Sequence, residues 1–246
     1  MREEFVPDPA ADREVWEAQQ REVADAALFA DDFDFDPDTV GSETGPLVAG
    51  VDQAFLDDRA VSAIVVTRGE TVVERTYAVT PLSVPYIPGL LSFREGGPIL
   101  DAFETLDSDP DLVFFDGSGR IHYRQAGLAT HMGVILDVPS VGVAKSLLCG
   151  NPVSSTENLP AGSRVAIEAN SRMDAPPGTV VGYAVQTRQY DSPDRHINPL
   201  YVSPGHRVGP ETAADWVARL STRYKLPEPT RLADSYADEA KQTIDT

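Results

Sequence analysis

Carboxylate side chains that could bind a metal ion together occur at separated positions in the sequence. Asp52 lies inside an apolar run, and Glu95 lies at the start of a predicted helix. Asp116 ends a second apolar run, and Asp234 lies in the last predicted helix. Hard oxygen ligands suit Mg²⁺ or Mn²⁺, whereas the sequence lacks the thiolate and imidazole clusters that bind zinc. Such sites hold the attacking and leaving oxygens of a phosphoryl transfer, so the acids predict metal-dependent phosphodiester chemistry.

Lys145 is a basic residue placed to assist such chemistry. It directly follows the apolar run 140–144. The chain contains only three lysines, so a role in solubility alone would be unexpected. A lysine beside a phosphate can stabilise the negative charge that develops during phosphoryl transfer.

Three strand-like runs must position the first of these acids. The runs are 47–55, 60–67 and 71–79, and the glycine turn at 68–70 is a hairpin signal, so we expect an antiparallel meander. Asp52 then lies within the first strand, either on its solvent face or, as its apolar neighbours favour, beside the core. An unpaired carboxylate is costly to bury, so a buried Asp52 would require a partner.

Helices and strands alternate after the meander. We expect helices over 92–106 and 127–137, and buried strands over 111–116 and 140–144. A strand–helix–strand succession implies a parallel crossover. A meander followed by this alternation is the order of an RNase H-like α/β fold, in which a mixed central sheet is flanked by helices. The acids can converge only if this sheet brings the first strand beside the fourth.

The rest of the chain predicts one domain, spanning residues 1–246. Neither an internal repeat nor a long linker interrupts it, although 31–46 reads as an acidic, solvated connection. Polar ends at 1–9 and 241–246 predict flexibility. The further elements that we expect are a helix within 10–30, strands over 164–168, 179–187 and 200–203, a helix over 211–224, and a last helix after 226–231.

A stiff turn precedes the helix that carries Glu95. Pro85 and Pro88 fix the backbone on either side of Tyr86, which predicts a rigid, exposed aromatic ring. Gly89 releases the restraint, and Ser92 can then cap the helix. The alternative is an ordinary proline turn with a packed tyrosine.

Composition indicates the cellular compartment in which the protein works. No apolar run approaches the ~20 residues that span a bilayer, and the start lacks the pattern of a signal peptide, so we expect no membrane contact. The single cysteine, Cys149, excludes an internal disulfide and fits a reducing compartment. We therefore expect a cytoplasmic protein.

The net charge of −19, from 39 acidic and 20 basic residues, has two interpretations. The first is avoidance of polyanions, because affinity for nucleic acid rises with the number of basic residues. The second is adaptation to a cytoplasm of very high salt, where the Debye length shrinks to ~3 Å at 1 M. Under the second interpretation, net charge says little about the partner.

Several short blocks together resemble the endonuclease V family, in its order and with similar spacing over residues 10–240. The blocks are 48–52, 85–95, 116–119, 127–133, 142–145 with 148–150, 202–207 and 226–231. The resemblance implies a DNA repair enzyme that recognises deoxyinosine, the product of adenine deamination. It also implies Mg²⁺-dependent hydrolysis of the second phosphodiester bond 3′ to the lesion, leaving 3′-OH and 5′-phosphate ends.

The resemblance also assigns roles to individual residues. It implies that Asp52, Asp116 and Glu95 bind the metal and act in catalysis, and that the remaining catalytic residues are His122, Lys145 and Asp234. Tyr86, with Pro85, Ile87 and Pro88, corresponds to a wedge that fills the gap left by the extracted base. Stacking on this ring would repay part of the energy lost when a base leaves the stack. The walls of the base pocket would be Gly89, Leu91, Gly117 and Gly127.

Two other functions remain compatible with the sequence. An enzyme of the same fold could cut inosine-containing RNA, and a binding protein could mark deaminated sites without cutting them. The presence of Asp52, Glu95, Asp116 and Lys145 argues against a mere binder, which does not need clustered acids beside a phosphate. We expect a monomer.

Overall fold

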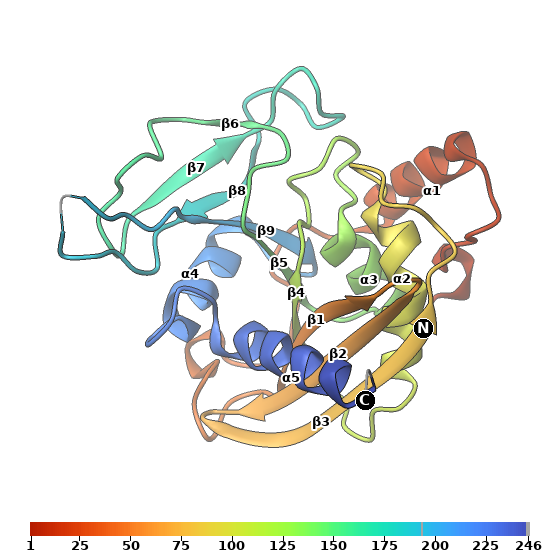
Figure 1. Cartoon of the computed structure of the whole chain (residues 1–246). Helices are drawn as coiled ribbons and strands as arrows, with labels where there is room; N and C mark the ends of the chain where they lie inside the picture. The colour runs from red at the N-terminus through yellow and green to blue at the C-terminus, as the bar shows by residue number, and fades with distance from the viewer. Residues whose placement is uncertain (193, 245–246) are drawn as a thin grey trace.

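The computed structural model describes residues 1–192 and 194–244 (Figure 1). Within them, nine strands form one sheet in the order β3-β2-β1-β4-β5-β9-β8-β7-β6. The strands are β1 (Val48–Leu56), β2 (Arg59–Arg68), β3 (Thr71–Pro81), β4 (Leu112–Asp116), β5 (Ser140–Ala144), β6 (Asn151–Pro152), β7 (Arg164–Glu168), β8 (Val180–Val185) and β9 (Leu200–His206).

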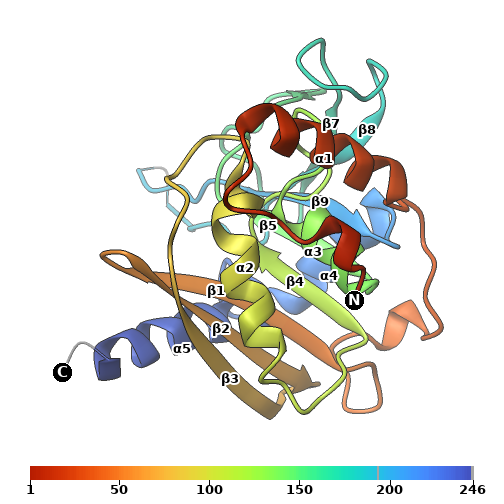
Figure 2. The ribbon, with the colours of Figure 1, turned by 90° about the vertical axis from the view of Figure 1, so that its right-hand side faces the viewer.

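Helices cover both faces of this sheet, as Figure 2 shows. Those of the described residues are η1 (Glu3–Phe5), α1 (Arg13–Ala26), η2 (Pro37–Thr39), α2 (Leu91–Phe103), α3 (Leu128–Leu136), α4 (Pro210–Leu220) and α5 (Glu228–Ile244). Residues of α2 and α3 pack on one face of the central strands, α4 and α5 pack on the other, and α1 lies outside α3. The layers arise because successive residues of a strand point to opposite faces.

The pairing of the central strands confirms the predicted RNase H-like order. β1, β2 and β3 form the antiparallel meander, and β1 pairs in parallel with β4, which pairs in parallel with β5. β4 and β5 are almost entirely buried, as expected of parallel strands covered on both faces. The first strand therefore lies beside the fourth, the condition that convergence of the acids requires.

Some predicted boundaries and caps differ from the structure. Leu90, not Ser92, is the N-cap of α2, and Ser92 is buried inside the helix. The helix ends at Phe103 rather than at residue 106. β9 runs three residues beyond the predicted 200–203, through Pro204, because a register shift beside this residue accommodates a proline in the ladder.

The acidic connection, residues 31–46, is more than the solvated segment that the sequence predicts. A carboxylate oxygen of Asp31 accepts a hydrogen bond of 2.6 Å from the backbone N–H of Gly209, just before α4. Phe33 and Phe35 stack on each other and pack against Trp216 of α4. The segment therefore fastens α4 to the sheet, and its acids partly serve local hydrogen bonds.

The two ends make specific contacts. The Arg2 N–H donates to the Ile135 carbonyl at 2.7 Å, and Pro7 is buried. α5 continues through residues 241–244, while residues 245–246 of the predicted flexible end lie outside the described residues. Of the helices described, none is long and apolar enough to cross a membrane.

Candidate active site

Strand register brings the first two acids together. Val51 of β1 lies opposite Phe115 of β4 in the parallel ladder, so Asp52 and Asp116 follow side by side at the next position. Asp116 also ends β4, at the carboxyl edge where α/β sheets bind ligands. Local sequence explains the strands, and the β1–β4 pairing explains why the two carboxylates meet.

Two helices bring the remaining acids to the same edge. Glu95 lies in the second turn of α2, where it is 8% exposed and feels the charge of Asp116. Asp234 lies on α5, which packs along β1, and its charge reaches Asp52. This close packing depends on Gly50, because a Cβ there would lie 2.0 Å from the Pro229 carbonyl oxygen. All four predicted acids thus act electrostatically on one region.

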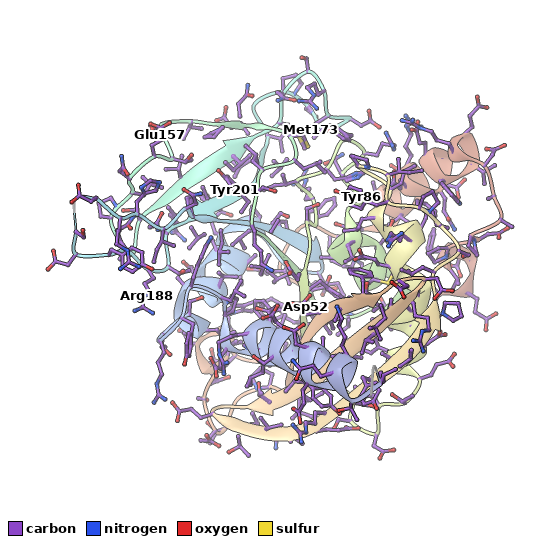
Figure 3. The ribbon with its side chains drawn as sticks, viewed as in Figure 1. Asp52, Tyr86, Glu157, Met173, Arg188 and Tyr201 are labelled. Carbon is purple, nitrogen blue, oxygen red and sulfur yellow. The ribbon has the colours of Figure 1, made fainter. Side chains whose placement is uncertain are left out.

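A cavity of about 300 Å³ opens in front of these acids. Asp52 and Tyr86 at its wall are marked in Figure 3, the first on β1 beside α5 and the second in the loop before α2. The lining residues are Val51, Asp52, Gln53, Phe55, Tyr86, Leu91, Glu95, Ile99, Phe115, Asp116, Gly117, Leu128, Ala144 and Lys145. We refer to it as the acidic cavity.

Burial and mutual repulsion raise the pKa of two of the carboxyls. Desolvation by burial, followed by the charge of Asp116, raises the pKa of Asp52 to about 8. Burial likewise raises the pKa of Glu95 to about 8, and Asp116 adds to the effect although Arg94 opposes it. Each group resists ionisation because burial removes water from its carboxylate and nearby positive charge does not make up for that loss. A cation in the cavity would supply further positive charge.

Lys145 supplies one positive charge to the site. Its Nζ donates a hydrogen bond of 2.8 Å to Oδ2 of Asp116. Burial lowers the pKa of Lys145, but attraction to Asp116 and Asp52 more than offsets this, so the pKa is raised overall. The ammonium is therefore charged, exposed and positioned at the end of β5.

The donor atoms of the acidic cavity suit a hard divalent cation. Its lining contains carboxylates and lacks imidazole and thiolate groups. Across residues 1–192 and 194–244, no three His, Cys, Asp or Glu side chains are arranged to hold a metal ion as they stand. The cavity therefore has suitable ligand atoms but not a closed ligand cage. Asp52 and Asp116, with Glu95 facing them, are the residues that could hold the ion.

A second cavity, of about 160 Å³, adjoins the acidic cavity. The two share the wall residues Tyr86, Leu91, Gly117, Leu128 and Ala144. The other lining residues of the second cavity are Gln20, Gly89, Ser92, Ser118, His122, Gly127, Ser146 and Leu148. It carries uncharged donors and acceptors and no carboxylate, so we refer to it as the neutral cavity.

Tyr86 stands at the rim between the two cavities. Its side chain is 66% exposed, which fits the predicted protruding ring and not a packed tyrosine. The loop around it is anchored because Val84 and Leu90 are buried in a cluster with Trp16, and Ile87 packs against the same cluster. Pro85 and Pro88 are exposed and line neither cavity.

His122 lies in the neutral cavity and away from the acids. Its Nδ1 accepts a hydrogen bond from the Arg124 N–H at 3.2 Å, so Nε2 carries the proton and donates to the Gly89 carbonyl at 2.9 Å. Burial lowers its pKa to about 4, which keeps the ring neutral. The ring therefore supports the wall of the neutral cavity, and the catalytic role that the family resemblance implies for His122 stays a prediction.

Glycines let the backbone form the walls of the neutral cavity. Gly89 has φ +81°, and a Cβ there would lie 3.1 Å from the ring of Tyr123. At Gly127 a Cβ would lie 2.3 Å from the Ser118 carbonyl oxygen. Both positions exclude side chains, so backbone groups can approach a ligand closely.

A third hollow, of about 490 Å³, lies on the other side of Lys145. Polar side chains form much of its wall, including Asn158, Asn198 and Tyr201. Lys145 lines both this hollow and the acidic cavity, and Ser146 lines both this hollow and the neutral cavity. The three hollows therefore form one continuous surface.

Sequence reasoning missed several wall residues. Ala144 and Leu128 directly neighbour residues that it did single out, Lys145 and Gly127. Gln20 gave no signal, because a glutamine in an amphipathic helix reads as part of the solvated face. Its position in the neutral cavity arises from packing between distant segments.

Known proteins resemble this chain over nearly its whole length. A family model described as Endonuclease V matches residues 36–235. An endonuclease V of Natronomonas pharaonis is 60% identical over 96% of this chain and 95% of its own length. The crystal structure of endonuclease V from Streptomyces avermitilis, 34% identical, superposes with a TM-score of 0.79 over 96% of each chain. That of Ciona intestinalis endonuclease V, 26% identical, covers 95% of this chain and all of its own with a TM-score of 0.74. It holds a 24mer DNA containing an inosine followed by a ribo-adenosine.

Proposed function

Because the chain belongs to the endonuclease V family, and is therefore a nuclease that hydrolyses phosphodiester bonds, we propose that it repairs DNA containing deoxyinosine. The proposed cut is at the second phosphodiester bond 3′ to the lesion and leaves 3′-OH and 5′-phosphate ends. The observation that carries the proposal is the shared wall of the two cavities. A phosphate at the acids and a base in the neutral cavity would lie on either side of Tyr86.

In this proposal the acidic cavity receives the scissile phosphate. Asp52, Asp116 and Glu95 are the ligands that would hold Mg²⁺, or Mn²⁺ in its place. The bound ion would supply positive charge to the attacking and leaving oxygens of the displacement. Asp234 adds negative charge beside Asp52 and so favours a cation there.

Lys145 holds a proton on Nζ at the mouth of this cavity. Its ammonium is bonded to Asp116 and remains accessible, so it can also donate to a non-bridging phosphate oxygen. This contact would strengthen as negative charge grows in the transition state. Leu91, Phe115 and Leu128 form apolar parts of the cavity wall.

The neutral cavity would receive the extracted base. Its walls offer backbone groups at Gly89, Gly117 and Gly127, which can pair with the polar edge of hypoxanthine. Tyr86, held by the anchored proline turn, would stack in the space that the base leaves. Stacking of this kind is worth roughly 1–3 kcal/mol and offsets part of the cost of unstacking.

We propose a monomer as the active species. Cys149 is buried and free, which fits the reducing cytoplasm as the place of action. Family membership makes the chain a nuclease, so the non-cutting binding protein considered from the sequence is set aside.

A second candidate substrate is RNA that contains inosine. The observation that favours it is the ribonucleotide after the inosine in the Ciona intestinalis complex. The acidic and neutral cavities would serve either strand, and the 2′-hydroxyl is the group that distinguishes RNA from DNA.

Nicking assays separate these possibilities. Labelled strands of identical sequence, as DNA and as RNA, with inosine or adenine at one position, are incubated with Mg²⁺ at low and high KCl. The proposal expects a single cut in the inosine DNA, directly after the nucleotide that follows the lesion on its 3′ side. Cutting of the RNA strand alone would show that RNA, and not DNA, is the substrate. Equal cutting of the adenine-containing strands would show that the enzyme does not recognise the lesion.

A further inference from the structure

α1 carries a polar residue on its buried face. Trp16, Gln20 and Val23 share the side of the helix that faces the protein, and Gln20 is only 1% exposed. A buried amide is costly unless its donors and acceptor are paired. Gln20 therefore needs defined partners.

Those partners are the two loops that wall the neutral cavity. The Nε2 of Gln20 donates to the Gly89 carbonyl at 3.0 Å and to the Ala126 carbonyl at 3.2 Å. Its Oε1 accepts from Nε of Arg124 at 2.8 Å. One side chain thus ties the loop before α2 to the loop before α3.

The Gly89 carbonyl is the point where the wedge loop, residues 85–88, turns into α2. It accepts from both Gln20 and Nε2 of His122, and the residue has the left-handed φ of +81°. The backbone conformation at this position is one that glycine adopts readily and other residues rarely do. Two donors on the same carbonyl then fix the direction in which the loop leaves the pocket.

We propose that Gln20 is a positioning residue for lesion recognition, which holds the wedge loop and the neutral cavity in the binding-competent arrangement before substrate arrives. The inference rests on the proposed function for its meaning. It goes beyond the family match, because α1 lies outside residues 36–235. Gln20 contacts no acid of the acidic cavity, so its effect should fall on substrate binding and not on the chemical step.

The central variant is Gln20→Met, which keeps the side-chain length and removes all three hydrogen bonds. Gln20→Glu is the conservative partner, because it keeps an acceptor for Arg124 but loses both donors to the carbonyls. Gln19→Met is the matched control on the same helix, since Gln19 makes only a long contact of 3.4 Å to the Val6 carbonyl.

Kinetics on inosine-containing duplex give the first readout. Both Gln20→Met and Gln20→Glu lose the two hydrogen bonds to the Gly89 and Ala126 carbonyls. This loss predicts a KM about 5- to 30-fold higher, with kcat within about twofold of wild type. The increase should be smaller on single strands, where the wedge does not hold a duplex open. A lower kcat with unchanged KM, or wild-type kinetics in a merely less stable protein, would overturn the proposal.

Hydrogen–deuterium exchange gives a second readout that needs no substrate. In free wild-type protein, the amide of Leu90, which donates to the Ile87 carbonyl at 3.0 Å, should exchange about as slowly as those of α2. Gln20→Met should accelerate its exchange, while Gln19→Met does not. Rapid exchange of this amide in wild type would overturn the proposal even if Gln20→Met failed to fold. If wild type does not nick inosine DNA but the exchange result holds, the proposed function fails and the positioning role survives.

Discussion

The Nζ of Lys145 lies 2.8 Å from Oδ2 of Asp116, and this ion pair joins the ends of two adjacent parallel strands. The lysine is exposed, whereas the aspartate lies deeper, beside Asp52. In the proposed function, a phosphate that enters the acidic cavity would meet the ammonium first and the carboxylates behind it. This order would let a chain of net charge −19 bind a phosphodiester at this edge.

Replacement of Asp116 by asparagine should abolish nicking and spare lesion binding. The substitution keeps the shape of the side chain but removes a proposed ligand charge and the partner of Lys145. We expect nicking of inosine DNA to fall by at least about a thousandfold, as for the loss of central transition-state interactions. Affinity, measured by fluorescence anisotropy, should remain within a few fold. Asp238→Asn, an exposed site on α5, is the control; near wild-type cutting by Asp116→Asn would remove Asp116 from the site.

Asp52→Asn should stabilise the protein without metal while it inactivates the enzyme. Burial and repulsion from Asp116 destabilise the ionised carboxylate of Asp52, as its raised pKa of about 8 indicates. For a chain of this size, the Tm in EDTA should rise by roughly 2–4 °C for each kcal/mol of repulsion removed. Added Mg²⁺ should raise the Tm of wild type more than that of the variant. A lower Tm in EDTA and an equal response to Mg²⁺ would contradict a metal site at Asp52.

Tyr86→Ala should weaken binding to inosine-containing duplex. Its exposed ring is worth roughly 1–3 kcal/mol as a stacking partner, which corresponds to about a 5- to 150-fold loss of affinity. The loss should be smaller on single strands. Tyr86→Phe should bind like wild type, because stacking uses the ring and not the hydroxyl. Normal binding by Tyr86→Ala, together with a Tm several degrees lower, would make Tyr86 a structural residue.

High salt should stabilise the protein. In 1 M salt the Debye length is ~3 Å, so repulsion among the 39 acidic residues is weakened. Urea unfolding in increasing KCl should give a rising free energy of unfolding, and nicking should persist above about 1 M, where long-range repulsion is screened. KCl is preferred over sulfate, which strengthens hydrophobic burial in any protein. A protein that unfolds in 1 M KCl and works best in dilute buffer would exclude salt adaptation.

Acid should destabilise the protein through His131. The ring is fully buried, its Nε2 donates to the Phe5 carbonyl at 2.8 Å, and its Nδ1 has no partner in the described residues. Burial lowers its pKa to about 4, below the unfolded value, so the unfolded state binds the proton first. The neutral ring therefore supports folding above pH 6.5, and this support is lost as the pH falls toward 4.

Replacement of His131 by glutamine checks this dependence. Between pH 7 and 5 the wild type should lose about 2 kcal/mol more unfolding free energy than His131→Gln. His196→Gln, which changes an exposed histidine, should follow wild type over the same range. Parallel pH profiles for wild type and His131→Gln would show that His131 does not titrate on unfolding.

Local pattern was sufficient for most of the elements and for the acids and the lysine that we propose as the site. Consecutive apolar residues specify β4 and β5, alternating turn signals specify the meander, and the acid at the end of β4 follows from the sequence of one strand. The family resemblance added the wedge and the pocket glycines. These features can be predicted from the sequence because each depends on neighbours within a few positions.

Partners of buried polar groups depended on the assembled fold. Gln20 and Gly89 are separated by 69 positions, and Asp31 and Gly209 by 178, so neither hydrogen bond leaves a trace in local pattern. The same holds for His122, to which the family resemblance assigned a catalytic role, while packing turns its ring toward the Gly89 carbonyl. A buried donor takes whichever acceptor the packed chain presents, because an unpaired one costs more than a local preference can supply.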